Sequence, residues 1–370
     1  MHLAFLSNEF PPEPHGGIGS FTVEMARALT SNGHRVSVIG FGNGPARSED
    51  GGLSLYRLPF PQRGAAPSIR ARIQLHRFLE RLYRNDPFDV LETPDFEGLL
   101  PLPFDHCPTV VRLHHAQSLL RPSLRSRVGP FEEQTLLHHR HWLAVSDHVL
   151  QQTTHYFELH PAASEVIPPP VCLERITDED RTAGPLPRKF VLVSGPLTEE
   201  KGAARLANLA PSWLQTDPEL FLIHTGSAER PMTRIVEAAC GEDAHRMAWL
   251  GWMPRSRFHY LLSQAEALIT LSTKESFGIT TAEASLSGCP VLSPRIPPFS
   301  DFYTDELIWY DPDHPAPTAD LLRDVLSDPD TARQRADQAA IRVRTECAPA
   351  LAAQRSLAFY ERFLPAGIHP

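Results

Sequence analysis

Two glutamates, Glu275 and Glu283, stand eight residues apart around a short run of small residues. The first lies in a polar loop after the apolar run 267–271, and the second lies about one turn into a helix that Thr280 or Thr281 can cap. A helix start presents free N–H groups and a partial positive charge, and both favour an anion such as a phosphate. A ligand over this helix start could therefore meet one carboxylate at each end.

This spacing also arises by chance, because the chain has 44 acidic residues among 370. Two solvated surface glutamates are the alternative interpretation. The neighbours favour a functional site: residues 276–278 read Ser-Phe-Gly, and small residues surround Glu283, where a bulky side chain would block the approach of a backbone. The stretch resembles the Glu-x7-Glu signature of glycosyltransferase family 4, the retaining sugar transferases of GT-B fold.

The resemblance implies transfer of a sugar from a nucleotide diphosphate, of the UDP or GDP type, with retained anomeric configuration. Glu275 would orient the sugar hydroxyls, and Glu283 would hold both ribose hydroxyls. Phe277, Gly278 and Ile279 would bind the donor at the helix start. The nucleotide-sugar is a co-substrate, so no separate cofactor and no metal are expected.

A glycine-rich loop follows the first predicted strand, residues 2–7, and leads into a helix. Such a loop can bring backbone N–H groups against a phosphate or a sugar. Gly16, Gly17 and Gly19 lack the spacing of the dinucleotide fingerprint, and taken alone the loop is a turn. Beside the other segments it resembles the Pro-Pro-x-x-x-Gly-Gly loop of family 4, in which the amides of Gly16 and Gly17 would face the donor diphosphate and the acceptor.

Two further strands end in polar residues at the edge where open α/β sheets bind ligands. Residues 89–98 end in an acidic loop whose carboxylates could contact an acceptor or could simply be solvated. Residues 109–115 end in two histidines. The resemblance implies a catalytic histidine that meets a donor sugar hydroxyl, for which His114 is predicted ahead of His115.

The second half restarts with a strand and the loop 195–202, which resembles the Gly-Arg-Leu-x-x-x-Lys-Gly loop of the family. Lys201 is present and would grip the donor diphosphate. Pro196 replaces the arginine, which removes a charge-assisted contact typically worth about 1.5–3 kcal/mol. Either another arginine substitutes, with Arg295 as a candidate, or the donor is held more weakly.

Composition excludes several other classes of protein. The net charge of -9 and the absence of long Lys/Arg runs argue against a nucleic-acid partner. The five cysteines form no CxxC pair, which argues against a zinc knuckle or a disulfide framework. His138 and His141 share a helical face, but no third ligand of suitable spacing accompanies them.

No apolar run approaches the roughly 20 residues that span a bilayer, so a cytoplasmic protein without a transmembrane segment is expected. Peripheral membrane contact stays open. The acceptor, whether a sugar, a lipid-linked molecule or another small molecule, is not indicated by any residue.

The alternation of strands and helices predicts an α/β protein with two Rossmann-like domains, as in the GT-B fold. The expected N-terminal, acceptor-binding domain covers 1–170 and includes a last helix from about 351–370 that crosses back. The expected nucleotide-sugar-binding domain covers 185–350, after a Pro-rich linker. The resemblance implies that the domains face each other across a cleft. Gly16, Gly17 and His114 are expected on one wall, and Lys201, Glu275 and Glu283 on the other.

Two alternatives remain beside the transferase. A catalytically silent GT-B protein that binds nucleotide or sugar would be consistent with Pro196, although Lys201 and both glutamates argue against it. A sugar-nucleotide epimerase of GT-B fold would leave the extended Glu-x7-Glu context unexplained.

Overall fold

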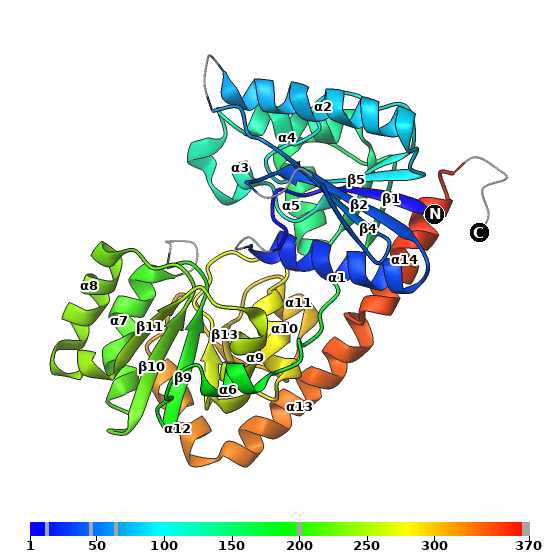
Figure 1. Cartoon of the computed structure of the whole chain (residues 1–370). Helices are drawn as coiled ribbons and strands as arrows, with labels where there is room; N and C mark the ends of the chain where they lie inside the picture. Colours follow the sequence, from blue (N-terminus) through cyan, green and yellow to red (C-terminus); the bar gives the residue numbers. More distant parts are fainter. Residues whose placement is uncertain (12–14, 44–46, 63–65, 198–201, 365–370) are drawn as a thin grey trace. The chain divides into compact units, whose positions relative to one another are not determined.

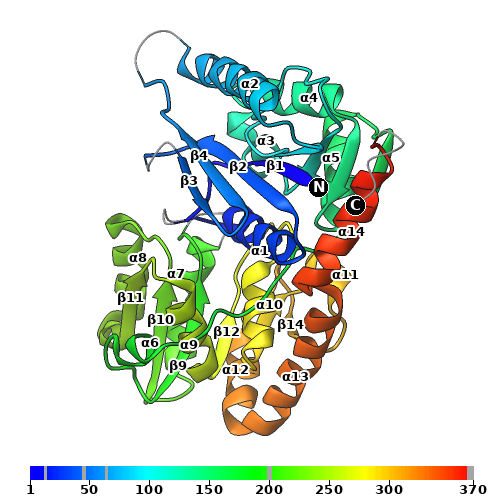
Figure 2. The same cartoon turned by 45° about the vertical axis from the view of Figure 1, so that its right-hand side comes forward.

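The computed structural model describes residues 1–11, 15–43, 47–62, 66–197 and 202–364 (Figures 1 and 2). None of the helices in these ranges is long and apolar enough to cross a membrane.

The chain forms two compact units. Unit 1 comprises Met1–Pro170 together with Ala348–Pro370, and unit 2 comprises Val171–Cys347. Each unit contains one mainly parallel sheet with helices on its faces, which confirms the predicted α/β fold with two parallel sheets.

The sheet of unit 1 has eight strands in the order β3-β4-β2-β1-β5-β6-β7-β8. The pairing is parallel except between β3 and β4 at one edge. The strands are β1 (His2–Leu6), β2 (Arg35–Phe41), β3 (Arg47–Asp50), β4 (Leu53–Leu58), β5 (Val90–Pro94), β6 (Thr109–Leu113), β7 (His141–Ala144) and β8 (Ala163–Val166).

Helices cover both faces of this sheet (Figure 1). Leu3 and Phe5 of β1 share a core cluster with α1 and α14, whereas Ala4 and Leu6 share another with α2. Alternate residues of a strand point to opposite faces, so a strand buried on both faces is apolar throughout. The helices are α1 (Gly17–Ser31), α2 (Pro67–Asn85), α3 (Gln117–Leu120), η1 (Pro122–Leu124), α4 (Gly129–His138), α5 (Asp147–Phe157) and α14 (Pro349–Glu361).

The last helix, α14, is bound to unit 1 by a buried polar network. Arg112 on β6 donates to Glu92 on β5 at 3.1 and 2.9 Å and to Ser356 Oγ at 3.0 Å, and Tyr360 donates its hydroxyl to Glu92. All four side chains are almost fully buried. At the rim of the helix, Arg355 donates to the carbonyl of Val166 at 2.8 Å.

Unit 2 has a six-stranded parallel sheet in the order β11-β10-β9-β12-β13-β14. A core cluster packs α7 and α12 against one face, around the buried Trp213 and Leu206. The strands are β9 (Lys189–Ser194), β10 (Leu220–Thr225), β11 (Met247–Gly251), β12 (Ala267–Ile269), β13 (Val291–Pro294) and β14 (Ile308–Tyr310). The helices are α6 (Asp178–Thr182), α7 (Ala203–Leu214), α8 (Arg230–Cys240), η2 (Gly241–Arg246), α9 (Arg255–Gln264), α10 (Ile279–Leu286), α11 (Phe299–Phe302), α12 (Thr318–Ser327), α13 (Pro329–Glu346).

The segment expected to be a linker contains the short helix α6, packed on α9. Thr177 and Asp180 form a reciprocal capping box at its start. Ser256 on α9 donates to Asp180 Oδ1 at 3.0 Å, and Arg257 donates to the Asp180 carbonyl. These bonds tie residues 177–182 to unit 2.

Candidate functional site

The predicted donor residues of unit 2 gather around the start of α10. Gly278 is the N-cap residue, in the left-handed conformation with φ +91°, so the helix begins one or two residues before the predicted threonine caps. A Cβ on Gly278 would lie 2.1 Å from Phe299 Cε1, so the helix start and α11 approach each other only because this residue is glycine.

The flanking residues of this helix start differ in exposure. Phe277 is 4% exposed and packs edge to face on Phe302, with ring centroids 4.9 Å apart. Ile279, the first residue of α10, is partly exposed. Phe277 therefore supports the loop from within the unit, whereas Gly278 and Ile279 are partly exposed.

Glu283 is buried on α10, and two side chains of α9 contact its carboxylate. Arg255 donates to Glu283 Oε1, and His259 Nε2 lies 3.2 Å from the same oxygen. The N–H of Glu174 donates to His259 Nδ1 at 2.9 Å, so Nδ1 is the acceptor nitrogen and Nε2 donates its proton to Glu283. Burial alone would raise the pKa of Glu283, but the bond from His259 and the charge of Arg255 lower it below its usual value. Glu283 is thus ionised at neutral pH.

Glu275 lies in the loop before α10. Ser272 Oγ, three residues after the end of β12, donates to Glu275 Oε1 at 2.7 Å. The side chain is partly exposed, in contrast to that of Glu283. The two predicted acids therefore lie near the same helix start, but Glu275 is partly exposed whereas Glu283 is buried.

The phosphate-gripping loop is only partly described. Lys201 lies outside the described residues. Gly202 has φ +80°, and a Cβ there would lie 2.2 Å from the carbonyl oxygen of Leu271, so the loop approaches the end of β12 closely. Pro196 and Arg295 are exposed, and the N–H of Arg295 donates to the carbonyl of Tyr310.

Arg205 is a cation that sequence reasoning missed. It lies in the first turn of α7, four residues after Lys201. Its Nη1 is buried and has no hydrogen-bond partner within the described ranges. The neighbouring Tyr310 donates its hydroxyl to the carbonyl of Thr270 at 2.7 Å. Burial raises the pKa of Tyr310, whereas the charge of Arg205 and a hydrogen bond from it lower that pKa. A guanidinium is thus held near the carboxyl end of β12 with donor capacity to spare.

In unit 1, the glycine-rich loop binds a carboxylate of its own chain. The N–H groups of Gly16 and Gly19 donate to Glu9 Oε2 at 2.8 and 3.2 Å. Gly17 is the first residue of α1. The Gly16 amide, expected to face a diphosphate, is therefore already occupied in this structure.

His114 lies at the end of β6 and contacts α1. Its ring packs edge to face on Phe21, with centroids 4.8 Å apart. Burial, with a smaller effect of the Arg112 charge, lowers the pKa of His114 to about 3. The imidazole is therefore neutral in the physiological range. His115 has φ +87° and is 2% exposed, which places it in the interior.

Two acids, Asp95 and Glu132, accept hydrogen bonds from backbone N–H groups near His114. Asp95 Oδ1 accepts from the N–H of His114 at 2.7 Å, and burial, together with the charge of Glu132, raises the pKa of Asp95 to about 8. Glu132 accepts from the N–H groups of Glu97 and Gln117 at 3.1 and 2.7 Å. The acidic loop predicted from residues 89–98 is thus part of a buried network rather than a solvated surface.

His138 and His141, considered as metal ligands, do not share a helical face as predicted, because His138 is the last residue of α4 and His141 is the first residue of β7. His141 instead stacks on Phe363 with ring centroids 3.8 Å apart. Within the part of the chain that the structure describes, no group of three His, Cys, Asp or Glu side chains could hold a metal ion.

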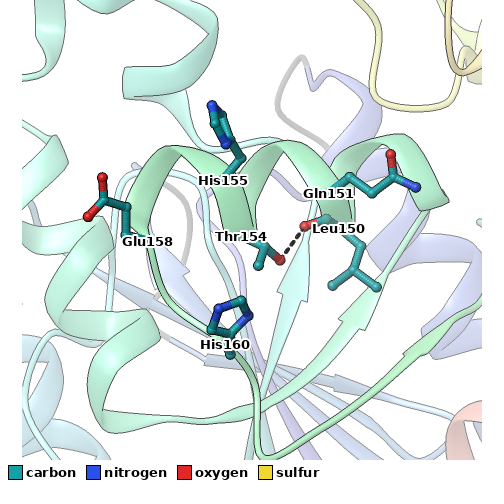
Figure 3. Close-up of a pocket in the computed structure, with 6 residues that line it drawn as sticks. All are labelled: Leu150, Gln151, Thr154, His155, Glu158 and His160. Atoms are coloured by element: carbon teal, nitrogen blue, oxygen red, sulfur yellow. Dashed lines mark hydrogen bonds between the residues drawn. The ribbon is translucent and has the colours of Figure 1, made fainter.

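A separate pocket of about 500 Å³ lies along α5 (Figure 3). Thr154 Oγ1 donates to the carbonyl of Leu150 at 2.7 Å, and no predicted site residue lines the pocket. The lining residues are Leu150, Gln151, Thr154, His155, Glu158 and His160.

Comparison with known proteins gives consistent matches over most of the chain. Residues 15–175 match the family model described as Glycosyltransferase Family 4, and residues 175–343 match Glycosyl transferases group 1. The phosphatidyl-myo-inositol mannosyltransferase of Mycobacterium tuberculosis (strain CDC 1551 / Oshkosh) is 28% identical over 294 residues, covering 77% of this chain and 75% of that protein. The D-inositol 3-phosphate glycosyltransferase of Corynebacterium glutamicum (strain R) is 27% identical over 60% of this chain and 58% of that protein.

Solved structures with the same fold cover nearly all of the chain. Sucrose-phosphate synthase from Thermosynechococcus elongatus superposes with a TM-score of 0.79 at 17% identity, covering 98% of each chain. Anabaena HepE, solved in complex with UDP and glucose, superposes with a TM-score of 0.74 at 15% identity, covering 97% of this chain and 99% of that one.

Proposed function

This chain belongs to the glycosyltransferases of family 4, and from that premise we propose that it transfers a sugar from a nucleotide diphosphate to an acceptor hydroxyl with retained anomeric configuration. The acceptor oxygen forms a bond to the anomeric carbon while the bond to the diphosphate breaks. The acceptor proton leaves on the diphosphate, so the products are a glycoside and a nucleoside diphosphate.

The observation that carries the proposal is the ionised Glu283 beside the start of α10. A buried carboxylate with lowered pKa retains capacity to accept hydrogen bonds, and two adjacent ribose hydroxyls are donors that suit it. The helix start next to it presents N–H groups to an anion. Together they match a nucleoside joined to a diphosphate.

The leaving diphosphate needs positive potential that is fixed before reaction. We assign this to the α10 start, to Lys201 and to Arg205. Arg205 is a better candidate than Arg295 for the missing arginine, because Arg295 is exposed whereas Nη1 of Arg205 is buried and unpartnered among the described residues. In this proposal Arg205 supplies the second positive charge that is absent at position 196.

His114 acts in this proposal as a neutral hydrogen-bond partner of a donor sugar hydroxyl. With its pKa lowered to about 3, it does not supply a proton at neutral pH. Glu275 orients the other hydroxyls, since Ser272 fixes one carboxylate oxygen and the side chain is partly exposed. The departing phosphate, rather than a protein base, takes the acceptor proton on the same face of the sugar.

The donor is expected to be a UDP- or GDP-sugar. Two of the structural neighbours were solved with UDP and glucose or with UDP-glucose, and one sequence relative is named as a mannosyltransferase. The names of the relatives do not agree on one acceptor.

Calorimetric titration with UDP, GDP and ADP, followed by turnover of the matching sugar donors, tests the proposal. We expect one nucleoside diphosphate to bind, its sugar donor to be consumed, and proton NMR to show a product with the anomeric configuration of the donor. Turnover should survive EDTA, because the proposed chemistry uses no metal. An inverted product would refute retention, and binding without turnover of any donor would favour the catalytically silent alternative.

A further inference from the structure

The start of α1 is closed by Glu9 rather than left open to an anion. Glu9 Oε2 accepts from Gly16 at 2.8 Å and from Gly19 at 3.2 Å, so the carboxylate already supplies the acceptor and the negative charge that a helix start favours. A Cβ on Gly16 would lie 3.2 Å from Oε2, tighter than ordinary contact, so glycine is the residue that admits the carboxylate. A phosphate could use these amides only by displacing Glu9.

A second carboxylate, Glu97, lies at the end of the neighbouring strand β5. Asn8 joins it to the glycine-rich loop, because Asn8 Nδ2 donates to Glu97 Oε2 at 3.0 Å while Asn8 Oδ1 accepts from the N–H of Phe41. Burial raises the pKa of Glu97, the Asn8 hydrogen bond and the charge of Arg72 lower it, and the charges of Glu9 and Glu132 raise it, with a net shift upward. These carboxylates are therefore close enough to repel one another, and an added anion would be repelled as well.

The guanidinium groups near these carboxylates are engaged by backbone carbonyls. Arg72 donates to the carbonyls of Glu97 and Gly98, the latter at 2.7 Å, and lies over the Phe131 ring at 4.0 Å. Arg57 donates to the carbonyl of Phe10 at 2.6 Å. These hydrogen bonds hold the loops in place and engage donors of both guanidinium groups.

A buried acid supplies an independent observation. Asp95 is fully buried, and its Oδ1 accepts from the N–H of His114, the residue assigned to the donor sugar. Its Oδ2 is buried without a hydrogen-bond partner among the described residues. Burying a polar atom without a partner is unfavourable, and a hydrogen bond from a ligand hydroxyl would offset that cost.

We infer that Glu9 makes the acceptor site of unit 1 selective for an uncharged, hydroxyl-rich acceptor and excludes acceptors that carry a phosphate. The hydrogen bonds described above to Glu9 and Glu97 reach Oε2 of each side chain, and carboxylate oxygens such as their Oε1 atoms can accept hydrogen bonds from sugar or polyol hydroxyls. This inference rests on the proposed transfer reaction and names its acceptor class.

Phosphate binding tests the occupied helix start without requiring turnover. Protein labelled with ¹⁵N-glycine is titrated with inorganic phosphate as wild type, as Glu9→Gln and as Glu133→Gln, an exposed control on α4 with the same loss of charge. The amide signals of Gly16 and Gly19 should respond to phosphate in Glu9→Gln and stay unchanged in the other two proteins. Equal responses in wild type and Glu9→Gln would overturn the inference.

Acceptor competition tests the consequence for specificity. Myo-inositol, glucose and glycerol are each compared with their monophosphates, using the donor identified by titration. Wild type should prefer the uncharged member in kcat/KM, and Glu9→Gln should narrow that preference by roughly tenfold or more, as expected for a lost contact of about 1.5–3 kcal/mol to a charged group. If circular dichroism shows that Glu9→Gln is misfolded, Glu9→Ala serves as a second variant.

The outcomes separate the two proposals. A wild-type preference for the phosphorylated acceptors, unchanged by Glu9→Gln, would refute the selectivity while leaving the transferase intact. Absence of donor turnover in every case would refute the transferase and the acceptor role of Glu9 with it, whatever the glycine signals show.

Discussion

Glu275 and Glu283 have different surroundings, and their substitution should have different effects. Glu283 is enclosed with Arg255 and His259, whereas Glu275 is partly exposed beside Ser272. We expect Glu283→Ala to weaken binding of the nucleoside diphosphate, because it removes the ribose acceptor and leaves a buried guanidinium without its carboxylate. Glu275→Ala should bind the diphosphate normally and lower kcat.

Calorimetry and steady-state kinetics distinguish these two effects. Glu266→Ala, at an acid that precedes β12, serves as a control for loss of one charge in unit 2. Equal affinities of wild type and Glu283→Ala for the free nucleoside diphosphate would contradict the ribose assignment.

Lys201 and Arg205 should share the neutralisation of the diphosphate. Lys201→Ala should cost at least the roughly 2–5 kcal/mol typical of truncating one partner of a buried charge pair, and nucleoside diphosphate should lose more affinity than nucleoside. Arg205→Gln should act in the same direction, and Arg295→Gln should have little effect. Measuring both ligands isolates the phosphate contribution. If diphosphate and nucleoside weaken equally, neither cation holds the diphosphate.

Asp95 should give the folded protein a distinct dependence on pH. Its pKa is raised from 3.8 to about 8 by burial first and by Glu132. The folded state then holds a proton that the unfolded state has lost above about pH 4, so this stabilisation is complete below pH 4 and disappears as pH rises through 8. Relative to Asp95→Asn, wild type should lose up to about 1.4 kcal/mol of unfolding free energy per pH unit in that window.

Urea unfolding of both proteins between pH 5 and pH 8 measures this difference. Because His114 and the other titrating groups are common to both proteins, their contributions largely cancel. A constant difference across the window would mean that Asp95 is ionised in the folded protein.

Among the helices and strands, the start of α10 depends on a single glycine, Gly278, for its backbone conformation. Gly278→Ala places a Cβ 2.1 Å from the Phe299 ring and forces φ +91° on a residue with a side chain. We expect destabilisation of about 1–3 kcal/mol from the positive φ alone, and more from the clash. The double variant Gly278→Ala/Phe299→Leu should recover the part due to the clash, and thermal unfolding measures both. A single variant as stable as wild type would contradict this account of the helix start.

Some elements were predictable and others were not, for identifiable reasons. The strand, loop and helix around Glu275 and Glu283 follow from periodicity within one continuous segment. Helix α6 was missed because its neighbouring prolines and polar residues read as a linker, although the Thr177 and Asp180 capping box is visible in the sequence. The threonine caps predicted for α10 were wrong, because a glycine with positive φ ends the loop instead.

Side-chain contacts made across loops and between helices were beyond prediction. Nothing in the order of residues indicates that Glu9 reaches the Gly16 amide, that His259 and Arg255 meet Glu283, or that Arg205 lies beside Tyr310. Each depends on how loops and helices pack in three dimensions. The placement of His114 at the end of a strand, by contrast, follows from the sheet pattern.

At the scale of the whole molecule, unit 1 is completed by the last helix of the chain. Tyr360 donates to Glu92, which Arg112 also contacts, and all three side chains are buried. Tyr360→Phe should therefore lower the unfolding free energy of unit 1 by about 1–3 kcal/mol, since it leaves a buried carboxylate short of a donor. The transition of unit 2 should be unchanged.

Differential scanning calorimetry can follow the two units as separate transitions where they unfold independently. Tyr260→Phe, on α9 of unit 2, is the matched control. A shift of both transitions by Tyr360→Phe, or of neither, would contradict the assignment of this hydroxyl to the core of unit 1.

Because α14 is the last helix of the chain, unit 1 can complete its core only after unit 2 has been synthesised. Unit 2, Val171–Cys347, is a continuous stretch of 177 residues (347 − 171 + 1), and it leaves the ribosome before α14 does. At about 5–20 residues per second, translation of that stretch takes roughly 9–35 s. During this interval the first 170 residues have been synthesised, but the helix that supplies Tyr360 and Ser356 has not. The nascent first unit therefore waits with Glu92 and Arg112 uncovered, and a ribosome that stalls within unit 2 would present a chaperone with an unfinished core.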